Sequence, residues 1–195
     1  DALTELLEST PEKITKEKVE EALVEHISAL RILPASEQPK DMVLLSTAVL
    51  QTATVFSHLR SLTEFLIVDF GAGLPPINQV LLPQCDQIVV VVNAFSSHLA
   101  QAKILIENLI NLGVEKEKII VVLNNKMRSD LLLSLSKVQE EIGYPISVAF
   151  TPAPELFFLA SRSNTTVVLN RPESLTAQQF QKMANMITSN KTKRK

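Results

Sequence analysis

The segment FLIVDFGAGLPP, residues 65–76, carries the residue types in this chain that are best suited to chemistry. Asp69 follows four apolar residues of strand character, and Gly71 and Gly73 come directly after it. In open α/β sheets, ligands bind beyond the carboxyl ends of the strands. A carboxylate there suits a hydrated Mg²⁺, and glycines let backbone N–H groups approach a phosphate. The alternative is an Asp that caps the next helix or closes a turn.

Apolar runs of strand length alternate with longer helical stretches along the chain. The predicted strands span residues 30–33, 65–69, 88–93, 119–124 and 147–150. The runs FLIV, IVVVV and IIVVL are apolar at every position, as expected of strands that are covered on both faces. The alternation predicts an α/β fold with a mostly parallel, doubly wound sheet and helices on both of its faces.

The predicted helices span residues 16–29, 42–62, 77–82, 98–112, 131–142, 155–161 and 175–188. Apolar residues recur at helical spacing over 98–112, and Gly113 offers a left-handed stop after them. Ser96 or Ser97 is the expected N-cap of that helix. The last helix carries an apolar stripe that we expect to dock against the sheet: Leu175, Phe180, Met183, Ala184 and Ile187.

Composition indicates one globular domain over residues 1–190, followed by a basic tail over 191–195. The net charge of −2 gives no overall attraction to a polyanion, so nucleic acid is not an expected partner. Cys85 is the only cysteine, which excludes an internal disulfide. No run reaches the roughly 20 apolar residues of a membrane-spanning helix. We therefore expect a cytoplasmic protein, whose tail is either solvated or in peripheral contact with the inner membrane surface.

The order of these elements resembles that of the ParA/MinD class of P-loop ATPases, and most closely the CpaE/TadZ pilus-assembly group. The resemblance covers nearly the whole chain. DALTELLES and EEALVEHISALRILPA are similar to the segment after the family's second strand, where a helix leads into a strand. DFGAGLPPINQVLLPQCDQIVVVVNAFSS resembles the Walker B region, with Cys85 and Asp86 at a recurrent small-residue and Asp pair. IIVVLNN and SVAFTPAPE resemble the strand and the proline-containing loop that meet adenine.

The resemblance implies roles for four residues. Asp69 would be the catalytic and metal-binding acid, and Gly73 would contact the γ-phosphate. Asn124 and Pro152 would hold adenine, and an amide suits a base because it donates and accepts at once. Asn125 stands where the family usually has a basic residue. The alternatives are an Asn that caps a helix or forms a turn, and a Pro that only ends a strand.

A phosphate-binding loop of the form G-x-x-x-x-G-K-[ST] is missing from the sequence. The four glycines are Gly71, Gly73, Gly113 and Gly143, and none is followed by Lys. The chain begins with Asp1, and the resemblance begins after the family's second strand. We therefore expect a P-loop NTPase-like domain that lacks its first βαβ portion. A degenerate relative is the alternative.

The resemblance implies an ATP-dependent switch that uses ATP and Mg²⁺, forms a homodimer and serves a pilus or secretion apparatus as an assembly or positioning factor. ATPase activity is expected of the intact protein and not of this chain alone. Two other functions remain open. One is a non-catalytic scaffold or interaction module with the same fold, and the other is a chromosome or plasmid partition ATPase.

Overall fold

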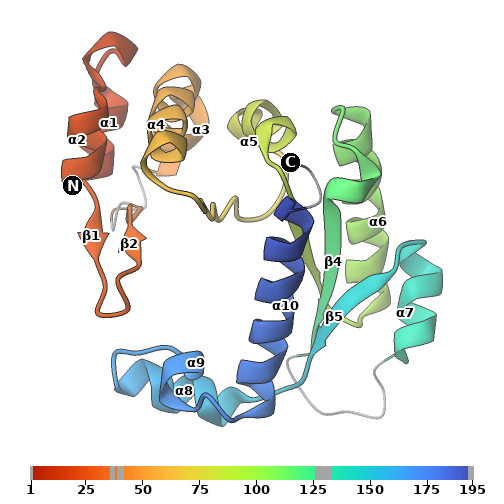
Figure 1. The fold of residues 1–195 in the computed structure, drawn as a ribbon. Helices are drawn as coiled ribbons and strands as arrows, with labels where there is room; N and C mark the ends of the chain where they lie inside the picture. The colour runs from red at the N-terminus through yellow and green to blue at the C-terminus, as the bar shows by residue number, and fades with distance from the viewer. Residues whose placement is uncertain (1, 36–37, 39–41, 126–132, 193–195) are drawn as a thin grey trace. The chain divides into compact units, whose positions relative to one another are not determined.

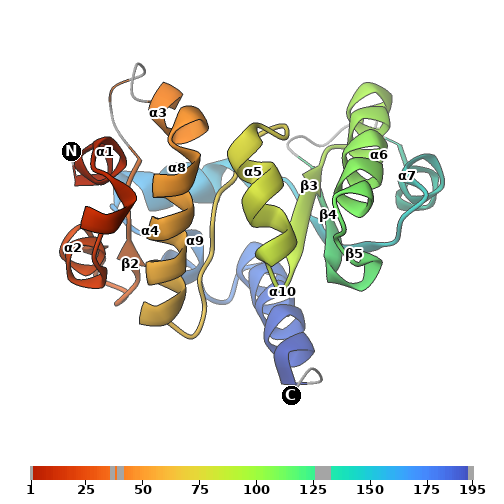
Figure 2. The same cartoon turned by 90° about the horizontal axis from the view of Figure 1, so that it is seen from above.

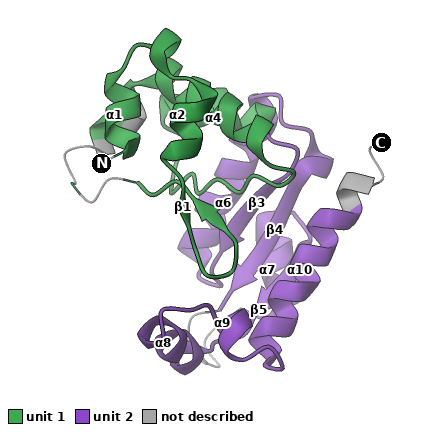
Figure 3. Cartoon of the chain, turned by 60° about the vertical axis from the view of Figure 1, so that its left-hand side comes forward, with its two compact units in different colours: residues 1–84 green, residues 85–195 purple. Residues whose placement is uncertain are grey.

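A computed structural model describes residues 2–35, 38, 42–125 and 133–192. Its internal contacts divide the chain into two compact units, residues 1–84 and 85–195 (Figure 3). The second unit holds a parallel sheet, and the first holds mainly helices. Each unit has a buried apolar cluster of its own.

The sheet of the second unit has three parallel strands in the order β3-β4-β5. They are β3 (Ile88–Val92), β4 (Ile119–Asn124) and β5 (Ile146–Phe150), which confirms three predicted strands. Ile88 is in register with Ile119, and Asn124 with Phe150. β4 is the central strand, and its first five residues are buried. An apolar run with no polar alternation forms such a strand because both of its faces are covered.

Helices cover both faces of this sheet (Figure 2). Helix α10 (Leu175–Thr192) lies on one face, where Met183, Met186 and Ile187 pack against a buried strand cluster made of Ile120, Val122 and Val148. Helices α6 (Ser96–Asn111) and α7 (Leu135–Ile142) contact each other and lie on the opposite face (Figure 1). The α/β architecture with helices on both faces of a parallel sheet is therefore confirmed.

The last helix docks on the sheet as predicted, although not with every residue of the predicted stripe. Phe180 packs on Phe150 with ring centroids 4.7 Å apart, and Met183 and Ile187 face the strand cluster. Leu175 and Ala184 are exposed instead. The basic residues 193–195 lie outside the described residues. Within the described part of the chain, no helix is long and apolar enough to cross a membrane.

Helix α6 begins two residues earlier than predicted and ends close to the predicted stop. Its N-cap is Phe95, so the expectation of a Ser96 or Ser97 cap is wrong: both serines lie inside the first turn. At the other end Gly113 has φ +90°, and Val114 N–H donates to the carbonyl of Leu109 at 3.0 Å. This is the left-handed stop that glycine makes without a Cβ penalty.

Two short helices, α8 (Pro154–Arg162) and α9 (Val167–Asn170), follow β5. Helix α8 was predicted, and α9 was not. The backbone N–H of Thr165 donates to the carbonyl of Ala160 at 3.0 Å and closes the turn between the two helices. The side chain of Ser174 caps α10 by accepting from the N–H of Ala177 at 3.1 Å.

The first unit contains α1 (Ala2–Glu8), α2 (Lys16–Glu21), α3 (Met42–Thr47), α4 (Val49–Leu62) and α5 (Pro76–Leu81). Short 3₁₀ turns lie at η1 (Pro11–Lys13) and η3 (Leu82–Gln84), and η4 (Lys116–Lys118) lies in the second unit. The core of the first unit is a buried cluster of Leu6, Ile14, Val19, Ala22 and Val55. The segment over 2–8 forms a helix that was not predicted.

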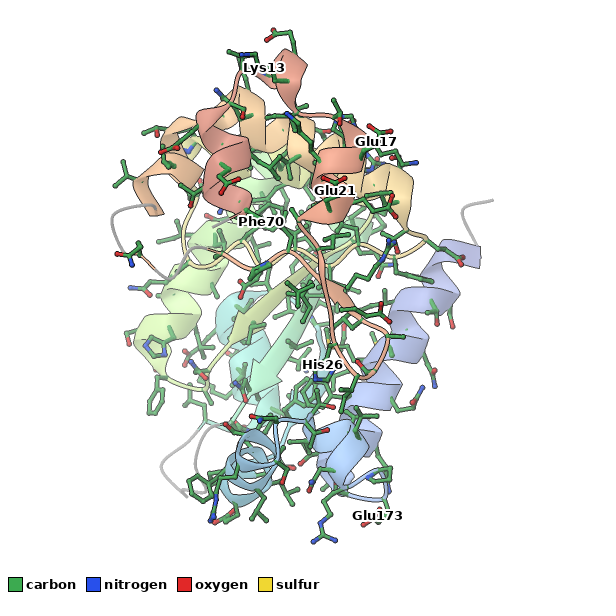
Figure 4. All side chains as sticks on the ribbon, turned by 90° about the vertical axis from the view of Figure 1, so that its left-hand side faces the viewer. Lys13, Glu17, Glu21, His26, Phe70 and Glu173 are labelled. Atoms are coloured by element: carbon green, nitrogen blue, oxygen red, sulfur yellow. The ribbon has the colours of Figure 1, made fainter. Side chains whose placement is uncertain are left out.

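The predicted helix over 16–29 is wrong in its second half. Helix α2 ends at Glu21, and the chain turns into an antiparallel hairpin of β1 (Val24–Glu25) and β2 (Arg31–Ile32). His26 lies in the hairpin loop (Figure 4), and Ala29 in the same loop has φ +62°. The expected strand over 30–33 survives only as the two residues of β2. The predicted helix over 42–62 breaks at Ala48 into α3 and α4.

The predicted strand over 65–69 is absent: residues 65–70 lie outside the helices and strands that the structure describes. Exposure alternates along the segment. Phe65 is 47% and Ile67 is 89% exposed, whereas Leu66 and Val68 are half-buried. The described strand registers join only β1 with β2 and β3 with β4 and β5. An apolar run becomes a strand only where neighbours supply a ladder and cover its faces, and this run has one uncovered face.

Candidate functional site

Three strand ends meet at the carboxyl edge of the parallel sheet. The register sets Val92 of β3 beside Leu123 of β4, and Asn124 of β4 beside Phe150 of β5. Asn93, Asn125 and Thr151 are therefore the first residues beyond three adjacent strands. Ligands of open α/β sheets bind at this edge. Two amides directly beyond the strands, with Asn124 as the last strand residue, give this edge a polar surface.

Two amide oxygens at this edge are buried without a hydrogen-bond partner. Within the described chain, Oδ1 of Asn93 and Oδ1 of Asn125 are closed off from solvent and accept no bond. The backbone of Asn125 is fixed, since its N–H donates to the carbonyl of Phe150 at 3.2 Å. An unsatisfied buried acceptor costs about 1–3 kcal/mol, so each such group calls for a partner such as an ordered water or a bound molecule. Both acceptors suit a ligand that brings N–H donors.

Pro152 lies two residues beyond β5, half-buried, on a loop that α10 holds in place. The N–H and the hydroxyl of Thr151 both donate to Oε1 of Gln179, at 3.2 and 3.3 Å. Helix α8 begins at Pro154, directly after the loop. The proline is thus fixed at the same edge as the three asparagines. This position is compatible with packing on a base and also with a proline that only ends a strand.

Asp69 and Gly73 lie in the first unit, on the loop between residues 65–68 and α5. Oδ1 of Asp69 accepts the backbone N–H of Gly71 at 2.9 Å, so the carboxylate closes a turn. Gly71 has φ +63° and Gly73 has φ +83°, which favour glycine at both positions. Asp69 is exposed. The turn-closing alternative is therefore what the structure contains, and metal binding by the same carboxylate stays a prediction.

Asn78 holds this loop in shape, and sequence reasoning missed it. The residue is 3% exposed, and its Nδ2 donates to the carbonyls of Phe70 and Gly73 at 3.0 and 3.3 Å. Gln79 adds a bond to the carbonyl of Leu74 at 2.8 Å. The available signal was an Asn inside the predicted helix, because Asn is unfavourable there unless its side chain has a partner.

Asn93 and Asn125 were also missed as site residues: Asn124 was predicted from the family resemblance, and the sequence signal that marks the other two was not used. Each is a polar amide at the end of a fully apolar strand. Of the four residues predicted from the sequence, Asn124 and Pro152 lie together at the sheet edge of the second unit. Asp69 and Gly73 lie together on one loop of the first unit.

The residues present fit part of a magnesium nucleotide. The orphaned acceptors of Asn93 and Asn125 fit the N–H donors of a base. On the metal side, Asp69 is the single acid on its loop. Among the described residues, no group of three or more His, Cys, Asp or Glu side chains is placed to hold a metal ion. Because none of the four glycines precedes a Lys, these residues do not supply a P-loop phosphate cradle.

No family model matches the sequence, and no curated protein matches it either. Solved structures do match the fold. A ParA family ATPase from Chlorobium tepidum TLS is similar with a TM-score of 0.76 and 18% identity, over 91% of this chain and 72% of that one. The cell division ATPase MinD of Pyrococcus furiosus is similar with a TM-score of 0.71 and 20% identity, over 96% of this chain and 81% of that one.

A third similar structure is MinD of Pyrococcus horikoshii OT3 in complex with Mg-ADP. Its TM-score is 0.69 at 20% identity, over 95% of this chain and 78% of that one. Likeness at these identities concerns the fold. The parallel sheet, the helices on both of its faces and these neighbours lead to one conclusion: the chain has the α/β fold of the ParA/MinD ATPases.

Proposed function

We propose that this chain supplies the base-binding side and the metal-side acid of a ParA/MinD-type nucleotide-binding protein. The observation that carries the proposal is the pair of buried, unpartnered amide oxygens of Asn93 and Asn125 at the carboxyl edge of the sheet. The fold supports it, because this edge is where α/β proteins take ligands. The choice of ligand is supported by one similar MinD protein, whose structure is a complex with Mg-ADP.

Adenine matches these amides chemically. Its exocyclic amino group donates, and the acceptors of Asn93 and Asn125 are the groups that lack donors. Asn124 adds an amide that both donates and accepts. Pro152 offers an apolar ring surface for the base. A base with a carbonyl in place of the amino group sets an acceptor against these oxygens and carries its N–H donor on the neighbouring ring nitrogen instead, and a donor in the wrong place is costly in a buried site.

Asp69 would act on the phosphate side, in the role its sequence position suggests. Mg²⁺, when bound, neutralises phosphate charge, and the chain's own contribution is a carboxylate that orients the ion and its water shell. The bond from Gly71 to Oδ1 fixes that carboxylate. Gly73 has no side chain to block the approach of its N–H to a γ-phosphate. Catalysis of this kind is positioning and electrostatics, so hydrolysis should be slow without a partner.

The biological role proposed for the intact protein is an ATP-dependent switch of the CpaE/TadZ kind. It would work as a cytoplasmic homodimer, in peripheral contact with the inner membrane or free of it, and would assemble or position a pilus or secretion apparatus. Support comes from the order of sequence elements and from the ParA/MinD fold. The net charge of −2 counts against a partition ATPase that acts on DNA.

A non-catalytic interaction module is the second candidate, and one observation favours it. The carboxylate of Asp69 already serves as a turn acceptor, and the segment before it is not built into the sheet. Such a protein would keep the fold and have no measurable nucleotide affinity.

Calorimetric titration of the intact protein with ATP and Mg²⁺ separates the two candidates. Asn125→Ala should weaken ATP binding about 10-fold or more, because one good hydrogen bond in a buried site is worth about 1.5 kcal/mol. The matched control is Asn108→Ala on α6, an exposed Asn far along the chain from the strand ends, which should bind like the parent. No heat of binding at millimolar ATP would overturn the nucleotide proposal and favour the module.

Asp69→Ala tests the metal side separately. If the carboxylate orients Mg²⁺, the variant should lose most of the gain in ATP affinity that Mg²⁺ brings, and should keep the affinity measured in EDTA. Gly71 then loses one hydrogen bond on an exposed loop, so folding should change little. An unchanged Mg²⁺ dependence would show that Asp69 only closes its turn.

A further inference from the structure

Helix α8 presents a stripe of four exposed residues on one face. Glu155, Phe158, Leu159 and Arg162 follow the i, i+3, i+4, i+7 spacing that brings side chains together on a helix. Phe158 is 62% and Leu159 is 44% exposed, and both charged residues are exposed as well. The helix buries Ala160 instead. Large apolar side chains left open between charges are typical of a contact surface.

The stripe has one charge at each end, of opposite sign and at equal distances from its centre. Glu155 lies in the first turn of α8 and Arg162 in the last turn. Their separation in sequence corresponds to about 10 Å along a helix axis, with Phe158 and Leu159 at the centre. The guanidinium carbon of Arg162 lies 5.9 Å from the ring centroid of Phe158, so the cation is already held over the apolar part of the stripe.

We propose that α8 pairs antiparallel with α8 of a second copy of this chain, around a twofold axis between Phe158 and Leu159. This arrangement sets Glu155 of each copy against Arg162 of the other and buries the four central apolar side chains. A twofold interface must be complementary to itself, and this stripe is. A parallel pairing would set like charges together, and a lipid surface would leave Glu155 without a cation.

Neighbouring residues enlarge the surface. Helix α9 contacts α8 (Figure 3) and exposes Val168 and Leu169. One aromatic side chain can bury roughly 150–250 Å², so the surface offers a few hundred Å² per copy, at the lower end for specific association. The dimer should accordingly be weak, with a Kd of roughly 10–500 µM. The inference goes beyond the proposed function, since this pairing needs no nucleotide.

Sedimentation equilibrium of the whole chain without nucleotide, from about 5 to 500 µM, tests the pairing. The parent chain should associate, and Phe158→Ser should weaken the dimer at least 10-fold, because it removes the central apolar contact. Ile104→Ser on α6 is the matched control, since Ile104 is a similarly exposed apolar residue of the same unit, and its dimer should be unchanged. Urea midpoints equal to that of the parent establish that each variant is folded.

Charge exchange tests the antiparallel geometry. Glu155→Arg should weaken association 3-fold or more, and adding Arg162→Glu to the same chain should restore it, because the opposite charges face each other again. Three results would each overturn the inference: a monomer at about 500 µM, a Phe158→Ser dimer as tight as the parent's, or no rescue by the double exchange. Absence of ATP binding would refute the proposed function and leave these results unaffected.

Discussion

Asn78 fixes the conformation of the loop that carries Gly71 and Gly73, directly before α5. It is buried, and its amide donates to two carbonyls, those of Phe70 and Gly73. These bonds cross five and eight residues of sequence, so they hold the loop against α5. Gly71 and Gly73 provide the positive φ angles, and Asn78 provides the bonds that select one conformation.

We predict that Asn78→Ala lowers the free energy of unfolding by about 1–2 kcal/mol, because two partly buried hydrogen bonds are lost and two carbonyls lose their donor. Urea unfolding followed by circular dichroism measures this change. Asn108→Ala, an exposed helical Asn, is the control and should change stability by less than about 0.5 kcal/mol. Equal stability of the two variants would contradict a supporting role for Asn78.

At this scale the sequence indicated the right kind of residue but not every position. The family resemblance led to Asn124. The strand-end rule, which led to Asp69, applies also to Asn93 and Asn125, whose acceptors the structure leaves unpartnered. Which of several neighbouring amides loses solvent depends on packing between strands that are far apart in sequence. Asn78 was missed for the same reason, since its partners are backbone carbonyls of a loop.

The elements that sequence predicted best are those whose signal is local. β3, β4 and β5 are apolar runs of strand length, and α6 has both helical spacing and a glycine stop. The predicted strand over 65–69 has the same local signal and is not a strand, because a strand also needs neighbours. The second half of the predicted helix over 16–29 is a hairpin, since its turn depends on a left-handed Ala29 that propensity does not predict.

Tyr144 links two of the well-predicted elements. Its hydroxyl donates to the carbonyl of Lys116 at 2.6 Å, which joins the turn before β5 to the turn before β4. Burial, and secondarily the charge of Glu117, raise the pKa of Tyr144 above its ordinary value of 10.0. A raised pKa means that folding favours the protonated phenol. Its contribution to stability is complete below about pH 10 and is lost as pH rises through the pKa of the folded state.

We predict that Tyr144→Phe costs about 0.5–1.5 kcal/mol of unfolding free energy at about pH 8, the usual value of one hydrogen bond. The difference between the parent and the variant should shrink above about pH 10, because the parent then loses the donor and the variant has none to lose. Urea titrations of both proteins at roughly pH 8 and pH 11 measure this difference in unfolding free energy below and above that pH. A difference that stays constant between these conditions would show that the hydroxyl makes no such contribution.

At the scale of the whole molecule, the fold class followed from alternation of strand and helix signals, and the sheet with helices on both faces confirms it. The composition of the sequence does not indicate the division into two compact units, residues 1–84 and 85–195. The reason is physical: the first unit is built from short helices whose faces are covered by one another, and such packing leaves no periodic signature over the whole chain.

The residues proposed for nucleotide binding are divided between the two units. Base recognition rests on the strand ends of the second unit, and the acid and glycines lie on a loop of the first. Recognition of the base is the more testable part, because it depends on a specific observation: two buried amide oxygens at the strand ends have no hydrogen-bond partner.

A competition between ATP and inosine triphosphate on the intact protein examines this recognition. The two bases exchange a donor and an acceptor: adenine carries an amino donor beside an unprotonated ring nitrogen, and hypoxanthine carries a carbonyl beside a ring N–H. We predict that ATP binds at least 10-fold more tightly, and that Asn93→Ala and Asn125→Ala each reduce this preference, since an unpaired buried acceptor costs about 1–3 kcal/mol. Equal affinity for the two nucleotides would refute recognition of adenine by these amides.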